Sequence, residues 1–371
     1  MPNRWRSASG IRCLRTSCSV DNLAHALVGA ALMRAVADRH VPRAALIGIV
    51  AANTPDFSEL LIGLPGTRAD YLVLHRGITH SLVGAGLEVV GLTLLIGAGW
   101  RVARWILGRH GRAVAVPAWG WLAMGIGAAV LSHLYMDWQG SYGWRPFLPW
   151  SGTWYYMDWV AIVDPFFWLV PLVALAWGAE RHWTPLAAAL VVGAAITFFL
   201  VRAHDLVAAW VLVVYAMVCL VAVLGWIGYW FGPARRQRAA ALALLLLAVY
   251  AGAQAVVAAG RKQEIHQVAA RRFGTHASWA ALTNVGRPFT WEAIYASADT
   301  VAGDDWQLPR HLRAREVQRA ITETRDGRAM AQFARFLAAE VDTSSATVYL
   351  WDARYARGSR DGWAVVRIRM E

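Results

Sequence analysis

The stretch His-Arg-Gly-Ile-Thr-His at residues 75–80 leads into a long apolar run, and together they predict a membrane helix over about 79–100. Two imidazole groups, a guanidinium group and a hydroxyl group therefore lie at the start of this predicted helix. Polar groups in such a place are energetically costly, and those that occur there usually serve a function. The same stretch thus predicts both a membrane fold and a functional site at one end of it.

The whole chain has the composition of a membrane protein. Of its 371 residues 57% are hydrophobic and 16% are charged, and the mean hydropathy is +0.38, which is too apolar for an ordinary soluble globule. A helix needs about 20 apolar residues to cross about 30 Å of hydrocarbon. We predict membrane spans at 79–100, 114–136, 159–179, 184–202, 206–231 and 239–259. Two shorter apolar segments, 22–38 and 42–55, are expected to form either short tilted helices or a buried amphipathic hairpin.

The predicted fold class is mainly α: a polytopic membrane helical bundle in residues 20–259, followed by a small extramembrane α/β domain in residues 260–371. From about residue 261 charged residues become frequent and apolar runs shorten. We predict strands in this domain at 287–297, 345–355 and 362–370, with a helical stretch at 312–340 between them. Its charge is mixed and it has no basic-aromatic motif, so we expect no nucleic-acid partner.

Residues 1–19 are rich in arginine and serine and contain no apolar core, so they do not resemble a secretory signal. We expect them to be a non-native or disordered N-terminal extension, with translation beginning at Val20. A peptide from residues 1–19 in the native protein would contradict this expectation.

The net charge of +12 is explained better by membrane topology than by nucleic-acid binding. Cytoplasmic loops near membrane helices carry an excess of arginine and lysine. The loops at 101–113, 180–183 and 232–238 hold many more arginines than the loops at the opposite helix ends. We therefore predict a multi-pass protein of the bacterial inner membrane with the 75–80 stretch on the periplasmic side. The inverted orientation stays open, because four basic residues follow the last span within 261–272.

Two His–Asp pairs lie close to the ends of predicted helices. Asp21 and His25, and likewise His133 and Asp137, are four residues apart, which places each pair on one helix face. Each pair has a workable geometry for two ligands of one metal, or for one ligand and the group that orients it. A hydrogen-bonded His–Asp pair without a metal is the alternative, but the nearby histidines of the 75–80 stretch favour a shared metal site.

His75 and His80 are five residues apart and would not face the same way on a continuous helix. Gly77 permits a turn before the helix begins, which would direct both rings inward, and Thr79 or Ser81 would then cap the helix. Arg76 would neutralise either an anionic substrate or a ligand carboxylate; the alternative is an interfacial arginine that extends to lipid headgroups.

Two further carboxylates adjoin apolar segments. Asp56 emerges at a turn after Pro55, either as a metal ligand or as a helix cap. Asp164 has apolar neighbours and precedes Pro165, so its charge should pair with another group. We expect that partner to be a metal or a histidine; a structural pair with an arginine is the alternative.

The order and spacing of five motifs resemble the YdjM-like family, whose members are described as metal-dependent hydrolases of the inner membrane. These motifs are Asp-Asn-Leu-Ala-His at 21–25, Asn-Thr-Pro-Asp at 53–56, the 75–80 stretch, Ser-His-x-x-x-Asp at 132–137 and Ile-Val-Asp-Pro at 162–165. The resemblance covers about 20–259. The segments Pro-Phe-Thr-Trp at 288–291 and Asp-Ala-Arg-Tyr at 352–355 are similar to the tail of longer members. The sequence departs from the usual family pattern at Ala24 and near Gln139, and neither departure falls on a proposed metal ligand.

The residues and the resemblance together predict a hydrolase that binds a divalent ion, with zinc preferred, and acts on a phosphoester or other ester of the membrane surface. The expected metal ligands are His25, Asp56, His75, His80, His133 and Asp137. The expected catalytic residues are Asp21 and Asp164, which would orient imidazoles or complete the ligand shell, and Arg76, which would bind phosphate. Membrane lipids are the expected partners. The alternative is a non-enzymatic transporter or assembly factor that uses the His/Asp cluster to move metal or protons.

Overall fold

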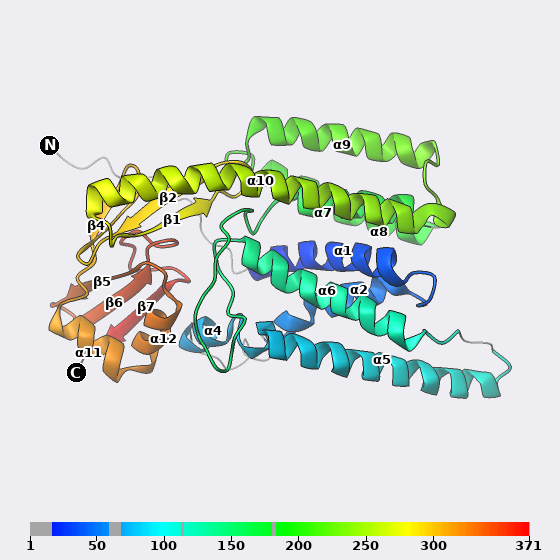
Figure 1. The fold of residues 1–371 in the computed structure, drawn as a ribbon, viewed down its shortest axis with the longest axis horizontal. Coiled ribbons are helices and arrows are strands. Elements are labelled where there is room, and N and C mark those ends of the chain that lie inside the picture. Colours follow the sequence, from blue (N-terminus) through cyan, green and yellow to red (C-terminus); the bar gives the residue numbers. More distant parts are fainter. Residues whose placement is uncertain (1–16, 59–67, 113–114, 180–182, 371) are drawn as a thin grey trace.

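The computed structural model describes the chain apart from residues 1–16, 59–67, 113–114, 180–182 and 371. Its helical part consists of α1 (Ser17–Ala37), α2 (Ala44–Asn53), α4 (Arg68–Leu74), α5 (Leu82–Arg109), α6 (Trp119–Gln139), α7 (Pro165–Trp177), α8 (Trp183–Arg202), α9 (Ala209–Ile227) and α10 (Arg236–Phe273). Short 3₁₀ turns, η1 (Thr54–Asp56) and η2 (Ile78–His80), precede α4 and α5, and η3 (Pro233–Arg235) precedes α10. Except for the short α4, these helices lie side by side as an elongated bundle (Figure 1).

Four helices of the described chain, α5, α8, α9 and α10, are long and apolar enough to cross a membrane. Their outer faces carry large exposed apolar side chains, such as Leu87, Val191, Val213 and Val249. Such a surface would be unfavourable in water but suits contact with lipid tails. The predicted fold class is therefore confirmed: a mainly α membrane bundle with a small C-terminal sheet region.

Two of the six predicted spans, 114–136 and 159–179, do not yield one of these four helices. The segment predicted at 159–179 yields only α7, because Asp164 caps the helix at its start and Pro165 occupies the first helical position. Residues 159–164 are accordingly non-helical. The segment predicted at 114–136 forms α6, which begins at Trp119 and extends to Gln139.

The two short N-terminal segments form α1 and α2, which pack tightly against each other. A Cβ atom at Gly29 would overlap Ala52 and lie 2.6 Å from the carbonyl oxygen of Gly48, so the helices approach to backbone contact. One apolar core joins α1 and α2 to α5 and α6, and a second joins α1 to α7, α8, α9 and α10. Helix α1 is thus central, whereas α2 buries one face against it and exposes Leu46, Ile49 and Val50 on the other, so only α1 matches a fully buried segment.

The C-terminal region forms two antiparallel sheets with two helices. The first sheet contains β1 (Ser278–Thr283), β2 (Trp291–Ala296), β3 (Thr300–Ala302) and β4 (Gln307–Pro309), in that order; the second contains β5 (Leu337–Asp342), β6 (Thr347–Asp352) and β7 (Val365–Arg369). Between them lie α11 (Arg315–Glu323) and α12 (Arg325–Phe333). The predicted helix over 312–340 is therefore interrupted at Thr324, whose side chain caps α12, and its last part is strand β5.

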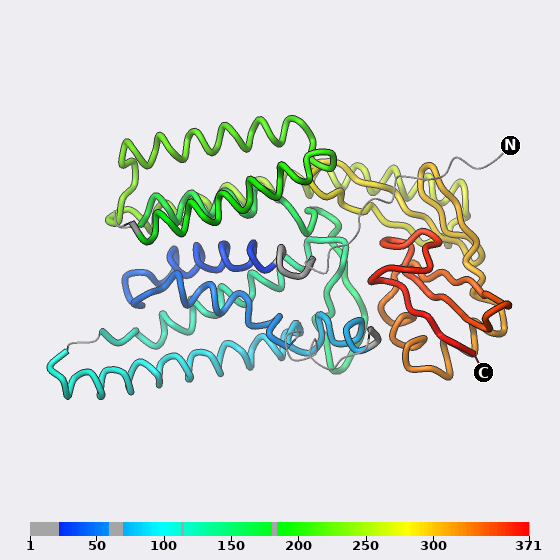
Figure 2. Tube along the Cα trace, turned by 180° about the vertical axis from the view of Figure 1, so that it is seen from behind, coloured from blue at the N-terminus to red at the C-terminus, as the bar shows by residue number. Residues whose placement is uncertain are grey.

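The C-terminal sheets lie at one end of the helical bundle (Figure 2). Helix α10 runs without a break through residue 260 and packs against β1 and β2 (Figure 1). The loop of residues 140–164 lies between the bundle and this region, and its Tyr142 shares an apolar core with Phe333 and Val366. The same end of the bundle carries the polar cluster described next.

Candidate metal centre

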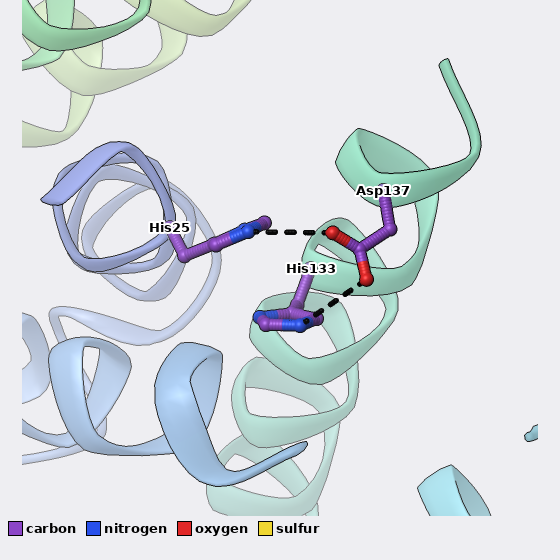
Figure 3. Close-up of side chains that lie close together, drawn as sticks. All are labelled: His25, His133 and Asp137. Carbon is purple, nitrogen blue, oxygen red and sulfur yellow. Dashed lines mark ion pairs between the residues drawn. The ribbon is translucent and has the colours of Figure 1, made fainter. Parts of the chain in front are cut away.

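Five side chains predicted as metal ligands meet at the bundle end nearest the C-terminal sheets. His25 comes from α1, Asp56 from η1, His80 from η2, and His133 and Asp137 from the last turns of α6. All but Asp56 are buried, and the side chain of Asp56 is 13% exposed. Figure 3 shows His25 and Asp137 pointing toward each other across the gap between α1 and α6, with His133 beside them. Within the described part of the chain the cluster is therefore largely enclosed, and Asp56 is its most exposed member.

The ring of His133 is held in one orientation by the backbone. Its Nδ1 lies 2.7 Å from the carbonyl oxygen of Ala52, so Nδ1–H donates to that oxygen. The lone pair of Nε2 then points into the cluster, 3.1 Å from Nε2 of His80. Proteins commonly fix metal-binding histidines through such a bond from the other ring nitrogen. His133 is thus prepared to bind a cation through Nε2.

Three atoms have the mutual spacing of metal ligands. The distances are 3.0 Å between Nε2 of His80 and Oδ1 of Asp56, 3.5 Å between Nε2 of His133 and the same oxygen, and 3.1 Å between the two nitrogens. Ligands about 2.0–2.1 Å from a tetrahedral zinc ion lie about 3.3 Å apart. The triangle formed by Asp56, His80 and His133 therefore matches one face of such a tetrahedron.

The two oxygens of Asp137 face different groups. Oδ1 lies 2.7 Å from Nη2 of Arg76 and 3.6 Å from Nε2 of His25. Oδ2 is buried, lies 3.5 Å and 3.6 Å from the Nε2 atoms of His80 and His133, and has no hydrogen-bond partner among the described residues. A buried carboxylate oxygen without a donor calls for a cation or an unseen partner. The residues present thus fit a divalent metal ion.

His25 completes a second group with His133 and Asp137, in which one ligand atom from each residue lies within 4.8 Å of the others. Its ring is stacked on that of His133, with centroids 3.8 Å apart. Because Nδ1 of His133 is engaged with Ala52, only Nε2 can bind an ion, and both groups must use it. The two groups therefore describe one shared ion position rather than two separate sites.

A family model of the YdjM inner membrane protein matches residues 20–261. The chain belongs to the YdjM inner membrane protein family. The matched region contains every member of the His/Asp cluster and ends inside α10, before the C-terminal sheets. No curated protein and no solved structure matches the chain.

The turn before α5 orients His80. Ser81 caps the helix by accepting a hydrogen bond from the backbone nitrogen of Gly84, so of the two predicted caps Ser81 is the one used. Thr79 lies 3.2 Å from Nδ1 of His80, which leaves Nε2 facing Asp56. A Cβ atom at Gly84 would overlap the carbonyl oxygen of Ile78. Glycine is therefore required for this close turn.

Arg76 lies beside the cluster and is buried. Besides its ion pair with Asp137, its Nη1 donates to the carbonyl oxygens of Asp137 at 3.1 Å and Gly143 at 2.8 Å. Its backbone is in the left-handed region, with φ of 52°, which is uncommon for a residue with a side chain. Of the predicted roles, these contacts favour neutralisation of a ligand carboxylate rather than phosphate binding.

Two other predicted site residues, His75 and Asp164, are not brought into the cluster. His75 lies against the rings of Tyr71 and Tyr142, each with centroids 4.8 Å away, and belongs to neither group. Asp164 caps α7 and accepts a hydrogen bond from the hydroxyl of Tyr250 at 2.7 Å. Asp21 is in α1, but its side chain lies outside the described part of the molecule.

One acidic residue was missed by the sequence analysis. Glu88 lies within the candidate span of α5, and both of its carboxylate oxygens are shielded, with no hydrogen-bond partner among the described residues. The signal was present, because a lone acid inside an apolar run is unusual. Glu88 differs from the predicted site residues in lying inside the span instead of at a helix end.

Proposed function

We propose that this protein is a membrane-bound, metal-dependent hydrolase whose divalent ion, with zinc preferred, is held by Asp56, His80 and His133. The observation that carries the proposal is the triangle of ligand atoms 3.0–3.5 Å apart around two oriented imidazoles. Catalytic zinc sites use three protein ligands and keep a further position for water or substrate. Two histidines and one carboxylate form a three-ligand set of this kind.

When bound, such an ion supplies a Lewis acid and lowers the pKa of a coordinated water towards about 7. The protein's own groups prepare the site. Ala52 and Thr79 set the ring orientations of His133 and His80. Oδ2 of Asp137 adds negative charge 3.5 Å and 3.6 Å from the Nε2 atoms of His80 and His133, and Arg76 holds that carboxylate in place.

We assign the substrate to the esters of the membrane surface, with a lipid phosphoester as the leading class. The cluster is nearest to solvent at Asp56. Among the described residues beside η1 and η2, Phe57, Ile78 and Leu82 are large, apolar and exposed. An amphipathic molecule with its ester at headgroup depth would place apolar chains against these residues and the ester near Asp56.

The test uses the full-length protein purified in detergent. Wild type is expected to contain about one equivalent of metal and to hydrolyse a model phosphodiester or a phospholipid, while His80→Ala loses both metal and activity. His204→Ala is the matched control, because the His204 side chain is 64% exposed and its partners among the described residues are Asp205 and the carbonyl oxygen of Val201, both far from the cluster in sequence. Metal binding without turnover of a broad panel of esters would show that the hydrolase assignment is wrong.

A second candidate, non-enzymatic handling of metal or protons, is favoured by Glu88. A shielded carboxylate inside a candidate span is typical of ion and proton pathways. If this candidate holds, wild type in liposomes moves zinc or protons across the bilayer and Glu88→Gln abolishes the flux. Hydrolysis that persists in Glu88→Gln, without any flux in wild type, would exclude it.

We also propose that the cluster and the C-terminal sheets face the periplasm of an inner membrane. The support is the family description and the excess of arginines in the loops at the other end of the bundle. An alkaline phosphatase fused after residue 371 should be active, since that enzyme matures only after export. A fluorescent cytoplasmic reporter at the same position, with an inactive phosphatase, would establish the inverted orientation.

A further inference from the structure

The loop beside the cluster is held from both sides by an arginine paired with an aspartate. On the membrane side, Arg76 is paired with Asp137. On the side of the C-terminal sheets, Arg354 is paired with Asp352, and both side chains are almost completely buried. The loop residues between these pairs are 141–143.

The two guanidinium groups bind three consecutive carbonyl groups of this loop. Nη1 of Arg354 donates to the carbonyl oxygens of Ser141 at 2.6 Å and Tyr142 at 3.1 Å. Nη1 of Arg76 donates to the next carbonyl oxygen, that of Gly143, at 2.8 Å. A shift of the loop on the C-terminal side is therefore transmitted directly to Arg76.

Asp352 fixes the guanidinium of Arg354. Its Oδ2 accepts from Nε of Arg354 at 2.9 Å and from Nη2 at 2.7 Å, and its Oδ1 accepts from the Arg354 backbone nitrogen at 3.0 Å. Burial alone would lower the pKa of Arg354, but the neighbouring Asp352 carboxylate outweighs it and raises that pKa. Arg354 therefore stays charged, and hydrogen bonds from a charged donor are the stronger kind.

Tyr142 provides a second link between the same two regions. The centre of the Arg76 guanidinium lies 4.5 Å from the centroid of the Tyr142 ring. The same ring lies 5.3 Å from Phe333 and is stacked on Trp363 at 6.1 Å, between centroids. Arg76 is thus held by a ring that the C-terminal region itself holds in place.

We propose that Arg354 is a positioning residue for the metal centre: it fixes the 141–143 carbonyls and thereby holds Arg76 against Asp137. The inference rests on the proposed metal site. It assigns the C-terminal sheets a part in metal retention, although every residue of the His/Asp cluster lies in the bundle.

The test measures the affinity of the purified full-length protein for zinc by competition with a chromogenic chelator. Arg354→Lys keeps the charge but lacks the planar group that binds Asp352 and two carbonyls together. We expect its zinc affinity to fall by up to about 10-fold, the lower end of the effect of losing a group that contacts a metal ligand, because Arg354 acts through the loop and Arg76. Asp352→Asn has nearly the same size as aspartate and should weaken zinc binding in the same direction, which keeps the test open if Arg354→Lys fails to fold.

Arg335→Lys is the matched control. Arg335 also joins the C-terminal region to the loop, through Nη1 at 3.1 Å and 3.0 Å from the two oxygens of Asp158, but it does not contact residues 141–143. This variant should loosen the same interface and leave zinc affinity unchanged. Equal loss of affinity in Arg335→Lys and Arg354→Lys would overturn the proposal, because any loosening of the interface would then suffice.

Two other results separate this proposal from the metal site itself. Zinc binding by wild type together with unchanged affinity in Arg354→Lys and Asp352→Asn overturns the role of Arg354 and leaves the metal site standing. Absence of zinc binding by wild type overturns the proposed metal site and, with it, this inference.

Discussion

Asp137 and Asp164 are both buried aspartates at helix ends, yet their surroundings differ. Both oxygens of Asp164 are satisfied by the protein: Oδ1 accepts from the backbone nitrogen of Phe166 at 2.9 Å, and Oδ2 accepts from the hydroxyl of Tyr250 at 2.7 Å. In Asp137 one oxygen pairs with Arg76, while the other faces two imidazole nitrogens with no hydrogen-bond partner among the described residues.

This difference separates a structural carboxylate from one prepared for a cation. A buried acceptor that the protein satisfies completely needs no further group, and Asp164 caps α7 in this way. A buried acceptor held next to oriented nitrogen lone pairs gains from a positive ion. Proximity to a bundle end, which the sequence does suggest, is therefore insufficient to identify a metal ligand.

The variant with the largest expected effect is His133→Ala. Nε2 of His133 belongs to both ligand groups, so its removal should leave neither able to hold an ion. We expect a loss of zinc affinity greater than the 10–100-fold, roughly, that follows loss of an orienting partner. Metal content of the purified protein by mass spectrometry measures this. Full metal occupancy in His133→Ala would contradict the shared-ion interpretation.

The comparison is tested most directly by the same chemical change at both aspartates. Asp137→Asn should lower zinc affinity by about 10–100-fold, because the amide is a weaker ligand and leaves the Arg76 charge without its carboxylate. Asp164→Asn should keep wild-type affinity, since asparagine also caps helices well. Chelator competition on both proteins gives the result. If both variants lose zinc to the same extent, the distinction between the two carboxylates is wrong.

A third test moves the turn that carries His80. Gly84→Ala should displace Ile78 and lower zinc affinity by up to about 10-fold, because overpacking shifts the backbone. Gly86→Ala is the matched control: a Cβ atom there meets nothing within 4 Å, so affinity should not change. Both are measured by the same competition. Equal affinities in the two variants would show that the turn does not limit the position of His80.

Much of the fold could be predicted because helix periodicity and apolar length are local properties. The strand at 337–342 could not, since Leu-Ala-Ala-Glu has good helix formers and becomes a strand only by pairing with β6, where Val341 lies opposite Val348. The predicted start of the span at residue 159 was likewise wrong. Asp164 caps α7, so the helix begins at Pro165 and the apolar residues before Asp164 stay outside it.

The candidate site was only partly predictable for a similar reason. The four-residue spacing of His133 and Asp137 indicates a common helix face, and the structure places both in the cluster. His75 and His80 flank the same glycine, and nothing local distinguishes the one that turns inward. The bond from His133 to Ala52 joins residues 81 positions apart, so it depends on packing that no sequence spacing shows.

The smallest effect on the metal centre is expected from Tyr250→Phe. This change removes the donor to Oδ2 of Asp164 and should cost about 1–3 kcal/mol of unfolding free energy, because the acceptor is a buried carboxylate. Zinc affinity should stay at the wild-type value.

Tyr215→Phe is the matched control, since its hydroxyl bonds the neutral Thr197 at 2.8 Å and its loss should cost less, about 0.5–1.5 kcal/mol. Thermal unfolding followed by circular dichroism compares the two, and chelator competition checks the metal. A fall in zinc affinity in Tyr250→Phe alone would place Asp164 in the metal centre after all, and the contrast with Asp137 would then be one of degree.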